Sequence, residues 1–281
     1  MSRPRRRVTV FAVEDTTAQV CWSALPPGTV RIAAGDAAAE VEVPDRPAPG
    51  SVVLEGLAPG TQHRLEVTAG GRPVRLAPGA DRFRTLAPPP GEVVARFATI
   101  SDMHIGERGF GIWPRVREPA GVAAEDSFTV RSTRAAIAEA VAWGAELVVA
   151  KGDLTYSGRP AQWDLAAKVL TGAPVPVHAT LGNHDVPTFA ADGRRALAAH
   201  GIVIARGPEC IDVPGLRIVV GHTAHRGRRG GTVDERQRAD LVRLAAEAPG
   251  PVLVALHHFP DPLPFPSRYP RGIAKAEGDA L

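Results

Sequence analysis

The sequence is poor in cysteine, lysine and aromatic residues. Its two cysteines, Cys21 and Cys210, lie far apart and in no metal-like spacing, so we expect both to be reduced and structural. Of the 33 basic residues only three are lysine, and the formal net charge is only +3. The high isoelectric point therefore reflects a slight excess of arginine rather than a polybasic tract, and nucleic-acid binding is not indicated.

Long hydrophobic runs are also lacking. No apolar run reaches the length of about 18 residues that a transmembrane helix needs. The apolar segment after the N-terminal arginines is interrupted by Glu14 and Asp15, which excludes a signal-peptide core. We therefore expect no membrane partner and a cytoplasmic location. With 44% hydrophobic and 22% charged residues among 281, the chain can bury a core, as one large domain or as two ordinary ones.

Residues 8–86 contain short β-type runs separated by proline and glycine. Strands are expected at 8–13, 18–22, 30–33, 51–54, 63–67 and 81–85. Several strands at this spacing favour an all-β sandwich. The run 57–67 contains Pro-Gly-Thr and resembles a corner of fibronectin type III domains. His63 stands where that family usually has tyrosine, and its imidazole can make the corner hydrogen bond instead.

The proline-rich run 87–91 indicates a stiff linker. With this linker as the boundary, the sequence predicts a fibronectin type III-like sandwich at 1–87, a linker at 88–95 and a second domain at 96–281. From Glu92 onward strands alternate with helical patterns, which is typical of an α/β layer structure. Helices are expected at 127–143, 160–170, 188–200 and 234–248.

Polar side chains follow four apolar, strand-like runs of this second region. The residues, in chain order, are Asp102 and His104, then Asp153, then Asn183, His184 and Asp185, then His257 and His258. In α/β proteins the chemistry lies at strand ends of this kind. Asp, Asn and His suit a hard or borderline divalent cation, and histidine also transfers protons near neutral pH. Four such strand ends indicate one functional site.

The order Asp-x-His, Gly-Asp, Gly-Asn-His-Asp and His-His resembles the calcineurin-like metallophosphoesterases, from about Arg96 to Pro260. The resemblance implies a four-layer α/β/β/α domain with two metal ions at its strand ends. One family element, a Gly-His-x-His motif after the His-His strand, is not found before Leu281. The domain is therefore expected to be C-terminally incomplete, with one protein donor fewer for each ion and with weak activity.

Asp153 matches the family position that bridges the two ions, since a shared carboxylate is needed between cations about 3.5–4 Å apart. Asp102 and His104 are expected to bind the first ion, because their spacing puts both side chains on one side of an extended segment. Asn183 and His257 are expected to bind the second, and the neutral amide adds no negative charge. This donor set suits manganese, iron or zinc. Such ions lower the pKa of a bound water to about 7, which makes it the expected nucleophile.

By resemblance His184 is not a ligand. It stands beside the leaving group, where it protonates the departing oxygen or holds a phosphate oxygen, with Asp185 orienting it. The sequence leaves a choice between His257 and His258, because Phe259 separates the pair from the proline that usually follows directly. We take His257 as the ligand.

The run Gly-Asp-Leu-Thr-Tyr, ending at Tyr156, partly resembles the purple acid phosphatases, where the tyrosine binds iron. In that branch the position of His104 is normally not a ligand, so His104 and Tyr156 compete for one role. We favour His104 as the ligand, with Tyr156 close to the ligands but not bound to the metal. The alternative is that the chain departs from both patterns.

The run Gly-His-Thr-Ala-His at 221–225 is similar to the absent Gly-His-x-His motif. Its spacing is one residue too long, however, and it precedes His257 in the chain. We therefore expect His222 and His225 at the rim of the site without a metal, with His222 in reach of substrate.

The expected function is a metal-dependent phosphoesterase, which hydrolyses a phosphomonoester or phosphodiester with water activated by two metal ions. The alternative is a degenerate, non-catalytic member that acts as a binding module through its fibronectin-like domain. The absent Gly-His-x-His motif favours the alternative, whereas the retained ligand set favours the enzyme. Metal content distinguishes them, because a degenerate member should hold no stoichiometric metal.

Overall fold

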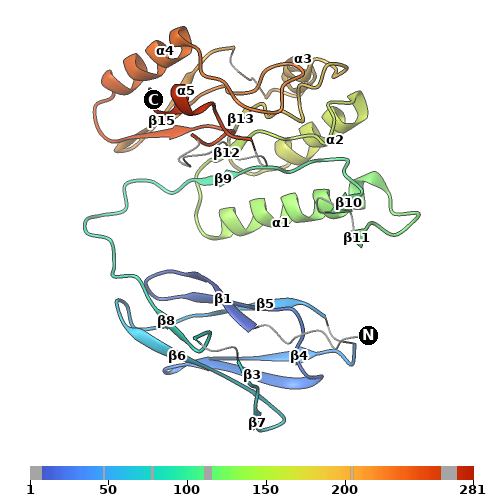
Figure 1. Cartoon of the computed structure of the whole chain (residues 1–281), viewed down its shortest axis with the longest axis vertical. Helices are drawn as coiled ribbons and strands as arrows, with labels where there is room; N and C mark the ends of the chain where they lie inside the picture. Colours follow the sequence, from blue (N-terminus) through green and yellow to red (C-terminus); the bar gives the residue numbers. More distant parts are fainter. Residues whose placement is uncertain are drawn as a thin grey trace. The chain divides into compact units, whose positions relative to one another are not determined.

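The computed structural model describes residues 8–46, 48–76, 79–110, 116–202, 204, 206–260 and 271–281. Internal contacts divide the chain into two compact units, Met1–Glu92 and Val93–Leu281 (Figure 1). The finer division into domains at 1–87 and 96–281 with a linker at 88–95 stays a prediction. No helix in the described ranges is long and apolar enough to cross a lipid bilayer.

Two antiparallel sheets make up the N-terminal unit. One has the strand order β1-β2-β5 and the other β4-β3-β6-β7, with β8 also paired to β6. The strands are β1 (Val8–Val13), β2 (Ala18–Trp22), β3 (Gly28–Ala34), β4 (Ala37–Val43), β5 (Gly50–Leu54), β6 (Gln62–Ala69), β7 (Arg72–Pro73) and β8 (Arg82–Arg84). Side chains from both sheets, among them Val20, Trp22, Ile32, Leu54 and Leu65, share one core. This arrangement confirms the predicted β-sandwich.

The sequence patterns missed strands β4 and β7. Strand β4 reads Ala-Ala-Ala-Glu-Val-Glu-Val, and alanine and glutamate are depleted in strands. Its pairing with β3 runs without a break from Gly28↔Val43 to Ala34↔Ala37. Tertiary pairing therefore overrides the weak local propensity of this segment.

His63 makes the corner hydrogen bond that the sequence predicted for it. Its Nε2 lies 3.0 Å from the carbonyl oxygen of Ala58, and its ring stacks on Phe83 with 5.4 Å between centroids. The Thr85 hydroxyl donates to the same carbonyl oxygen at 2.7 Å. The imidazole thus ties the loop before β6 to the last strand, the role expected of a tyrosine.

The C-terminal unit contains two three-stranded sheets and one small hairpin. The first sheet is parallel, with the order β13-β12-β9. In the second, of order β14-β15-β16, the first pair is antiparallel and the second parallel. The strands are β9 (Ala98–Ile100), β12 (Val148–Lys151), β13 (Val177–Thr180), β14 (Glu209–Val213), β15 (Leu216–Val220) and β16 (Val252–Ala255), and the hairpin is β10 (Gly109–Phe110) with β11 (Val116–Arg117).

Helices cover the outer faces of these two sheets. The helices are α1 (Phe128–Ala142), α2 (Pro160–Thr171), α3 (Gly193–Ala198), α4 (Glu235–Ala246) and α5 (Lys275–Gly278), with a 3-10 turn η1 (Ala124–Asp126). Alternate residues of β12 face opposite ways, so Ala150 packs with Ile137 of α1 while Val149 packs with Ile218 of the second sheet. Leu241 of α4 packs on the far side of the second sheet. Figure 1 shows α1 and α4 on opposite sides of the strands, which confirms the four-layer α/β/β/α fold.

The predicted helix at 188–200 is wrong in its first part. Helix α3 begins one residue after Asp192, whose carboxylate accepts a hydrogen bond from the Arg195 N–H at 3.4 Å. Just before it, the N–H of Ala191 donates to the carbonyl oxygen of Gly158 at 2.9 Å. That bond fastens the backbone to the loop after β12, so the helix cannot extend backward.

Candidate metal centre

The carboxyl ends of β9, β12 and β13 meet at one edge of the parallel sheet. Asp102 follows β9, Asp153 follows β12 and Asn183 follows β13. The N–H of Asp102 donates to the Gly152 carbonyl oxygen at 3.1 Å, and the N–H of His104 donates to the Asp153 carbonyl oxygen at 2.9 Å. The loops that carry the predicted ligands are therefore held side by side by their backbones.

Three predicted ligands have a strained backbone. Within the described part of the chain, the non-glycine residues with positive φ are Asp102 (56°), His104 (48°) and Asp153 (50°). The left-handed conformation costs an L-residue about 1–2 kcal/mol, and strain of this kind clusters at functional sites. The extended backbone predicted for 102–104 is therefore wrong, because these side chains converge through left-handed turns.

Asp153 presents its two carboxylate oxygens to two different imidazoles. Its Oδ2 lies 3.3 Å from Nε2 of His104, and its Oδ1 lies 3.4 Å from Nε2 of His257. The carboxylate is buried, with 3% of the residue exposed. Asp102 adds a second carboxylate, whose Oδ1 lies 3.8 Å from Nε2 of His104.

Two overlapping groups of possible ligands share Asp153. The ligand atoms of His104, Asp153 and His184 lie within 4.8 Å of one another, and so do those of Asp102, Asp153 and His257. Two carboxylates and three imidazoles that converge on one spot form a donor set that fits divalent cations. Metal ions of the kind that the sequence predicted therefore fit the residues present.

Glu107, which the sequence analysis missed, contacts the outer nitrogen of His104. Its Oε2 lies 3.0 Å from His104 Nδ1, which leaves Nε2 directed at Asp102 and Asp153. A carboxylate in this place fixes the tautomer and orientation of a metal-binding imidazole. Only the three-residue spacing from His104 pointed to Glu107, and such spacings are common.

The same contacts perturb the ionisation of this cluster. Burial lowers the pKa of His104, but the close carboxylates of Asp102 and Asp153 and the charge of Glu107 raise it by more, to about 10. The nearby His104 imidazole lowers the pKa of Asp102 to about 2. Before a cation arrives, the imidazole therefore carries the positive charge that offsets the carboxylates.

His257, rather than His258, reaches the carboxylate cluster. Its Nδ1 donates to the carbonyl oxygen of Lys151 at 2.8 Å, so the ring turns Nε2 toward the site. There Nε2 lies 3.4 Å from Oδ1 of Asn183. His258 is buried and bonds through Nδ1 with the Thr223 hydroxyl at 2.8 Å. Burial lowers the pKa of His258 to about 4, so it stays neutral at physiological pH.

The glycine before Asn183 makes room for Asp153. A Cβ on Gly182 would lie 2.2 Å from both the backbone nitrogen and the Oδ1 of Asp153. A Cβ on Gly152 would lie 2.7 Å from Nδ1 of His257. Both glycines of the Gly-Asp and Gly-Asn-His-Asp motifs are therefore required by close approach to the candidate ligands.

The Asp185 carboxylate binds groups other than the His184 imidazole, whereas the sequence predicted that it orients that ring. This buried carboxylate accepts hydrogen bonds from the N–H groups of Leu154 (3.0 Å), Thr155 (2.8 Å) and Gly182 (2.9 Å) and from the Thr155 hydroxyl (2.8 Å). Burial raises its pKa to about 6, although these hydrogen bonds lower it. Asp185 therefore fastens the turn after Asp153 to the turn before Asn183.

A backbone carbonyl orients His184 instead. Its Nδ1 donates to the carbonyl oxygen of Tyr156 at 2.8 Å, and its N–H donates to Oδ1 of Asp153 at 2.8 Å. The Tyr156 ring is partly exposed and lies 5.9 Å from the His184 ring and 6.1 Å from the His104 ring, centroid to centroid. Tyr156 therefore borders the cluster.

The histidines of the 221–225 run follow strand β15. His222 is buried, and its Nδ1 lies 2.6 Å from the hydroxyl of Thr180, at the end of β13. His225 is exposed and lines a separate cavity together with His222. Neither belongs to the candidate ligand groups found in the described residues.

A four-layer domain with carboxylates and imidazoles at the carboxyl ends of its strands has the architecture of a metallophosphoesterase. A sequence model of the calcineurin-like phosphoesterase family matches residues 95–280, and the chain belongs to this family. The match confirms the family resemblance predicted from the motifs. No curated protein sequence matches the chain.

Solved structures resemble the chain only distantly. A dimetal phosphatase from Danio rerio is 15% identical and aligns over 67% of this chain and 76% of its own, with a TM-score of 0.46. PhoD is 10% identical over 88% of this chain, with a TM-score of 0.32, and the chain spans 61% of its length. The fn3 domain of human collagen alpha-1(XX) is 25% identical over 32% of this chain and 89% of its own, with a TM-score of 0.24.

Proposed function

We propose that this chain is a metal-dependent phosphoesterase, which hydrolyses a phosphomonoester or phosphodiester at a centre of two metal ions. The observation that carries the proposal is the position of Asp153, whose two oxygens face the Nε2 atoms of His104 and His257. A carboxylate that faces two separate imidazoles is suited to bridge two cations.

In this proposal Asp102, His104 and Asp153 hold one ion, and Asp153, Asn183 and His257 hold the other. This division differs from the two groups described above: it pairs Asp102 with His104, 3.8 Å away, and Asn183 with His257, 3.4 Å away, and it leaves His184 free for another role. When bound, the two ions supply Lewis acidity and lower the pKa of a water to about 7. The protein's own part is to fix the donors. The Lys151 carbonyl oxygen accepts a hydrogen bond from Nδ1 of His257, and the Glu107 carboxylate forms an ion pair at Nδ1 of His104, so that both Nε2 atoms face inward.

His184 is proposed to give its proton to the departing oxygen of the ester. Its Nδ1–H is held by the Tyr156 carbonyl oxygen, so Nε2 is left on the side of the cluster. The proton that is given up is the second one, which Nε2 carries in the imidazolium form. Asp185 supports this geometry indirectly, because it fastens the turn that ends in Tyr156 through Leu154 and Thr155. General acid catalysis of this kind typically contributes about 10²–10⁴-fold.

The test is hydrolysis of p-nitrophenyl phosphate and of bis(p-nitrophenyl) phosphate by the purified chain. We expect turnover of at least one ester with manganese, iron or zinc present, loss of turnover after chelation, and recovery when the metal is restored. If neither ester is hydrolysed with any of the three metals bound, the proposed activity is wrong.

A further inference from the structure

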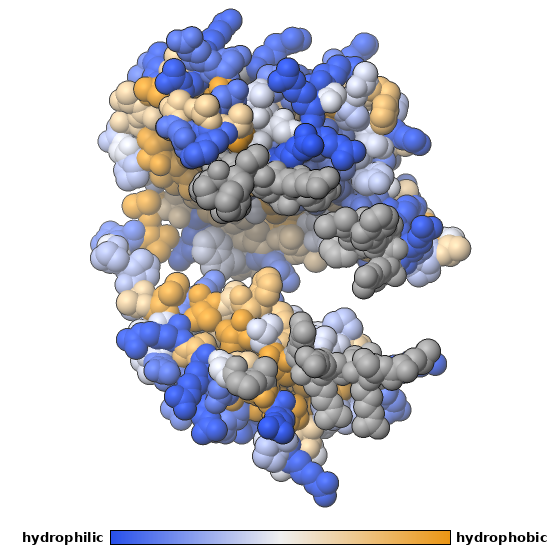
Figure 2. All heavy atoms as spheres, viewed as in Figure 1, coloured by the Kyte–Doolittle hydropathy of each residue, from blue (hydrophilic) through white to orange (hydrophobic). Residues whose placement is uncertain are grey.

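A cavity of about 480 Å³ in the C-terminal unit is lined by none of the candidate metal ligands. Four segments line it: helix α3, the residues before β14, the loop after β15 and the first turns of α4. This volume lies within the usual range of small-ligand pockets, about 300–1,000 Å³. Figure 2 shows hydrophilic side chains gathered over the part of the C-terminal unit where α3 and α4 lie.

The acidic residues of this cavity are already engaged. The Asp234 carboxylate accepts a hydrogen bond from the Gln237 N–H at 2.8 Å, where it caps the start of α4. The Asp240 carboxylate lies 3.5 Å from the Arg243 guanidinium. Each of these carboxylates therefore has a contact on α4 itself, although Arg243 also pairs with Glu247 at 3.2 Å.

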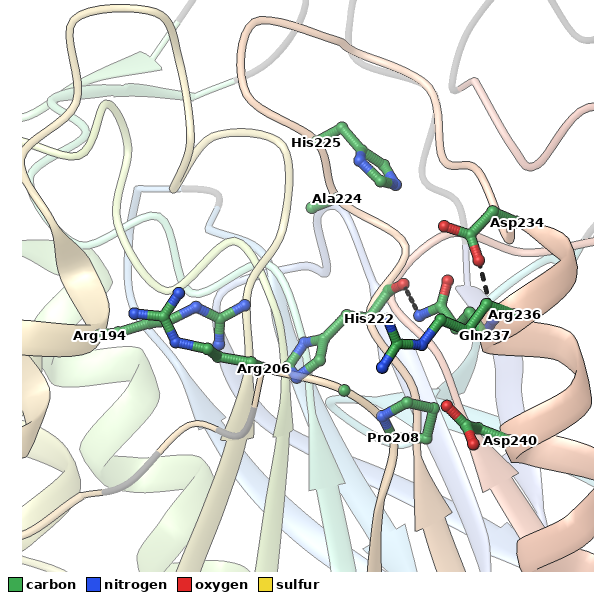
Figure 3. Close-up of a pocket in the computed structure, with 11 residues that line it drawn as sticks. Arg194, Arg206, Pro208, His222, Ala224, His225, Asp234, Arg236, Gln237 and Asp240 are labelled. Carbon is green, nitrogen blue, oxygen red and sulfur yellow. Dashed lines mark hydrogen bonds between the residues drawn. The ribbon is translucent and has the colours of Figure 1, made fainter.

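Two of the three arginines that line the cavity, Arg206 and Arg236, have no such ion pair among the described residues. Neither guanidinium has a carboxylate within 4.0 Å in that part of the chain. Arg194 lies beside Arg206. Burial lowers the pKa of Arg194, and the nearby positive charge of Arg206 lowers it further. Figure 3 shows the Arg194 and Arg206 side chains together and the Arg236 guanidinium directed from α4 toward His222. Guanidinium groups gathered in this way are suited to bind a phosphate group.

His222 joins this cavity to the metal centre. It lines the cavity, and its Nδ1 lies 2.6 Å from the hydroxyl of Thr180, which closes the strand leading to Asn183. His222 stands two residues after the end of β15, and His257 stands two residues after the end of β16. The two strands are parallel neighbours, and their last residues, Val220 and Ala255, are paired. Neighbouring strands lie about 4.8 Å apart, so the cavity borders the site that holds the reacting ester.

We propose that this cavity binds a phosphate group other than the one that is hydrolysed, with Arg206 and Arg236 as its main contacts. This inference rests on the proposed phosphoesterase activity, because it takes the metal centre as the place where an ester is hydrolysed. The phosphate comes either from a substrate that carries a second phosphate or from free phosphate. A doubly phosphorylated substrate would place its scissile ester at the metals and its other phosphate among the arginines.

The first experiment titrates inorganic phosphate into the purified chain by calorimetry, independent of turnover. We expect Arg206→Gln and Arg236→Gln each to weaken one class of phosphate sites at least about tenfold, the effect of losing roughly one charge-assisted bond. The matched control is Arg238→Gln, on the same helix but outside the cavity lining. If wild type and all three variants bind phosphate alike, the inference is wrong.

The second experiment separates the two sources of phosphate. Wild type and Arg206→Gln are compared on propyl phosphate and on alkanediol bisphosphates of three to six carbons. A KM raised at least about tenfold for a bisphosphate alone supports a second substrate phosphate, and a loss of phosphate binding with unchanged KM values supports free phosphate. Absence of turnover with intact, arginine-dependent phosphate binding would reject the proposed activity and leave the cavity assignment standing.

Discussion

Oε2 of Glu107 lies 3.0 Å from Nδ1 of His104, on the side of the ring away from the two carboxylates. Glu107→Gln should weaken metal affinity about 10–100-fold, the usual effect of losing a carboxylate behind a metal-binding imidazole. An amide can also donate to Nδ1, which permits the wrong tautomer. Metal affinity is measured by competition with a coloured chelator. Glu125→Gln, an exposed site beside α1, is the control, and equal affinity in both variants would contradict this role for Glu107.

Metal binding should strengthen as pH rises. The metal-free His104 has a pKa of about 10, so it is protonated at neutral pH and must release a proton to become a ligand. One released proton raises the apparent association constant about tenfold per pH unit, as long as the pH stays below that pKa. Titrations between pH 6.5 and pH 8.5 measure this slope. In His104→Gln the part of the slope due to this proton should vanish, and a wild-type affinity independent of pH would contradict the assignment.

Gly182→Ala should damage both stability and metal binding. The added Cβ would lie 2.2 Å from the nitrogen and Oδ1 of Asp153, closer than atoms can approach, so the backbone must move. Overpacking of this kind costs about 1–3 kcal/mol, and the displaced carboxylate can no longer face both imidazoles. Gly250→Ala is the control, because its nearest neighbour would be 3.7 Å away. Chemical denaturation and metal titration measure the two effects, and wild-type behaviour of Gly182→Ala would show that the close packing is not required.

His184→Ala should slow hydrolysis by about 10²–10⁴-fold while most of the metal stays bound. The reason is that the proposed ligands do not include this imidazole, although its ring lies 4.5 Å from the His104 ring. Turnover of p-nitrophenyl phosphate and metal content are measured on the same preparation. If the substitution strips the metal, His184 is a ligand and its role as proton donor is wrong.

The sequence predicted the outlines of the fold because hydrophobic periodicity and turn residues are local signals. Strand β4 escaped because its alanines and glutamates have low strand propensity, and its pairing with β3 is a tertiary contact. The prediction of a helix at 188–200 was wrong in its first part for a similar reason. There the N–H of Ala191 donates to the carbonyl oxygen of Gly158, which is distant in the sequence.

For the site, the motifs identified which residues converge but not how they are held. The left-handed turns at Asp102 and Asp153 follow from backbone contacts between neighbouring loops, which no spacing encodes. Asp185 was expected beside His184, yet its carboxylate is fully used by the backbone of residues 154–155 and 182. Glu107 has no motif of its own, so only the structure could associate it with His104.

The central claim is that one carboxylate, Asp153, organises two metal ions. The most direct measurement is the metal content of wild type, Asp153→Asn and the exposed control Asp164→Asn after loading with manganese and removal of unbound ions. An amide keeps the size of the side chain but loses the charge and one of the two oxygens that face His104 and His257. We expect two ions per chain in wild type and control, and loss of both together in Asp153→Asn. Unchanged metal content in Asp153→Asn, or loss of only one ion, would contradict the bridging role.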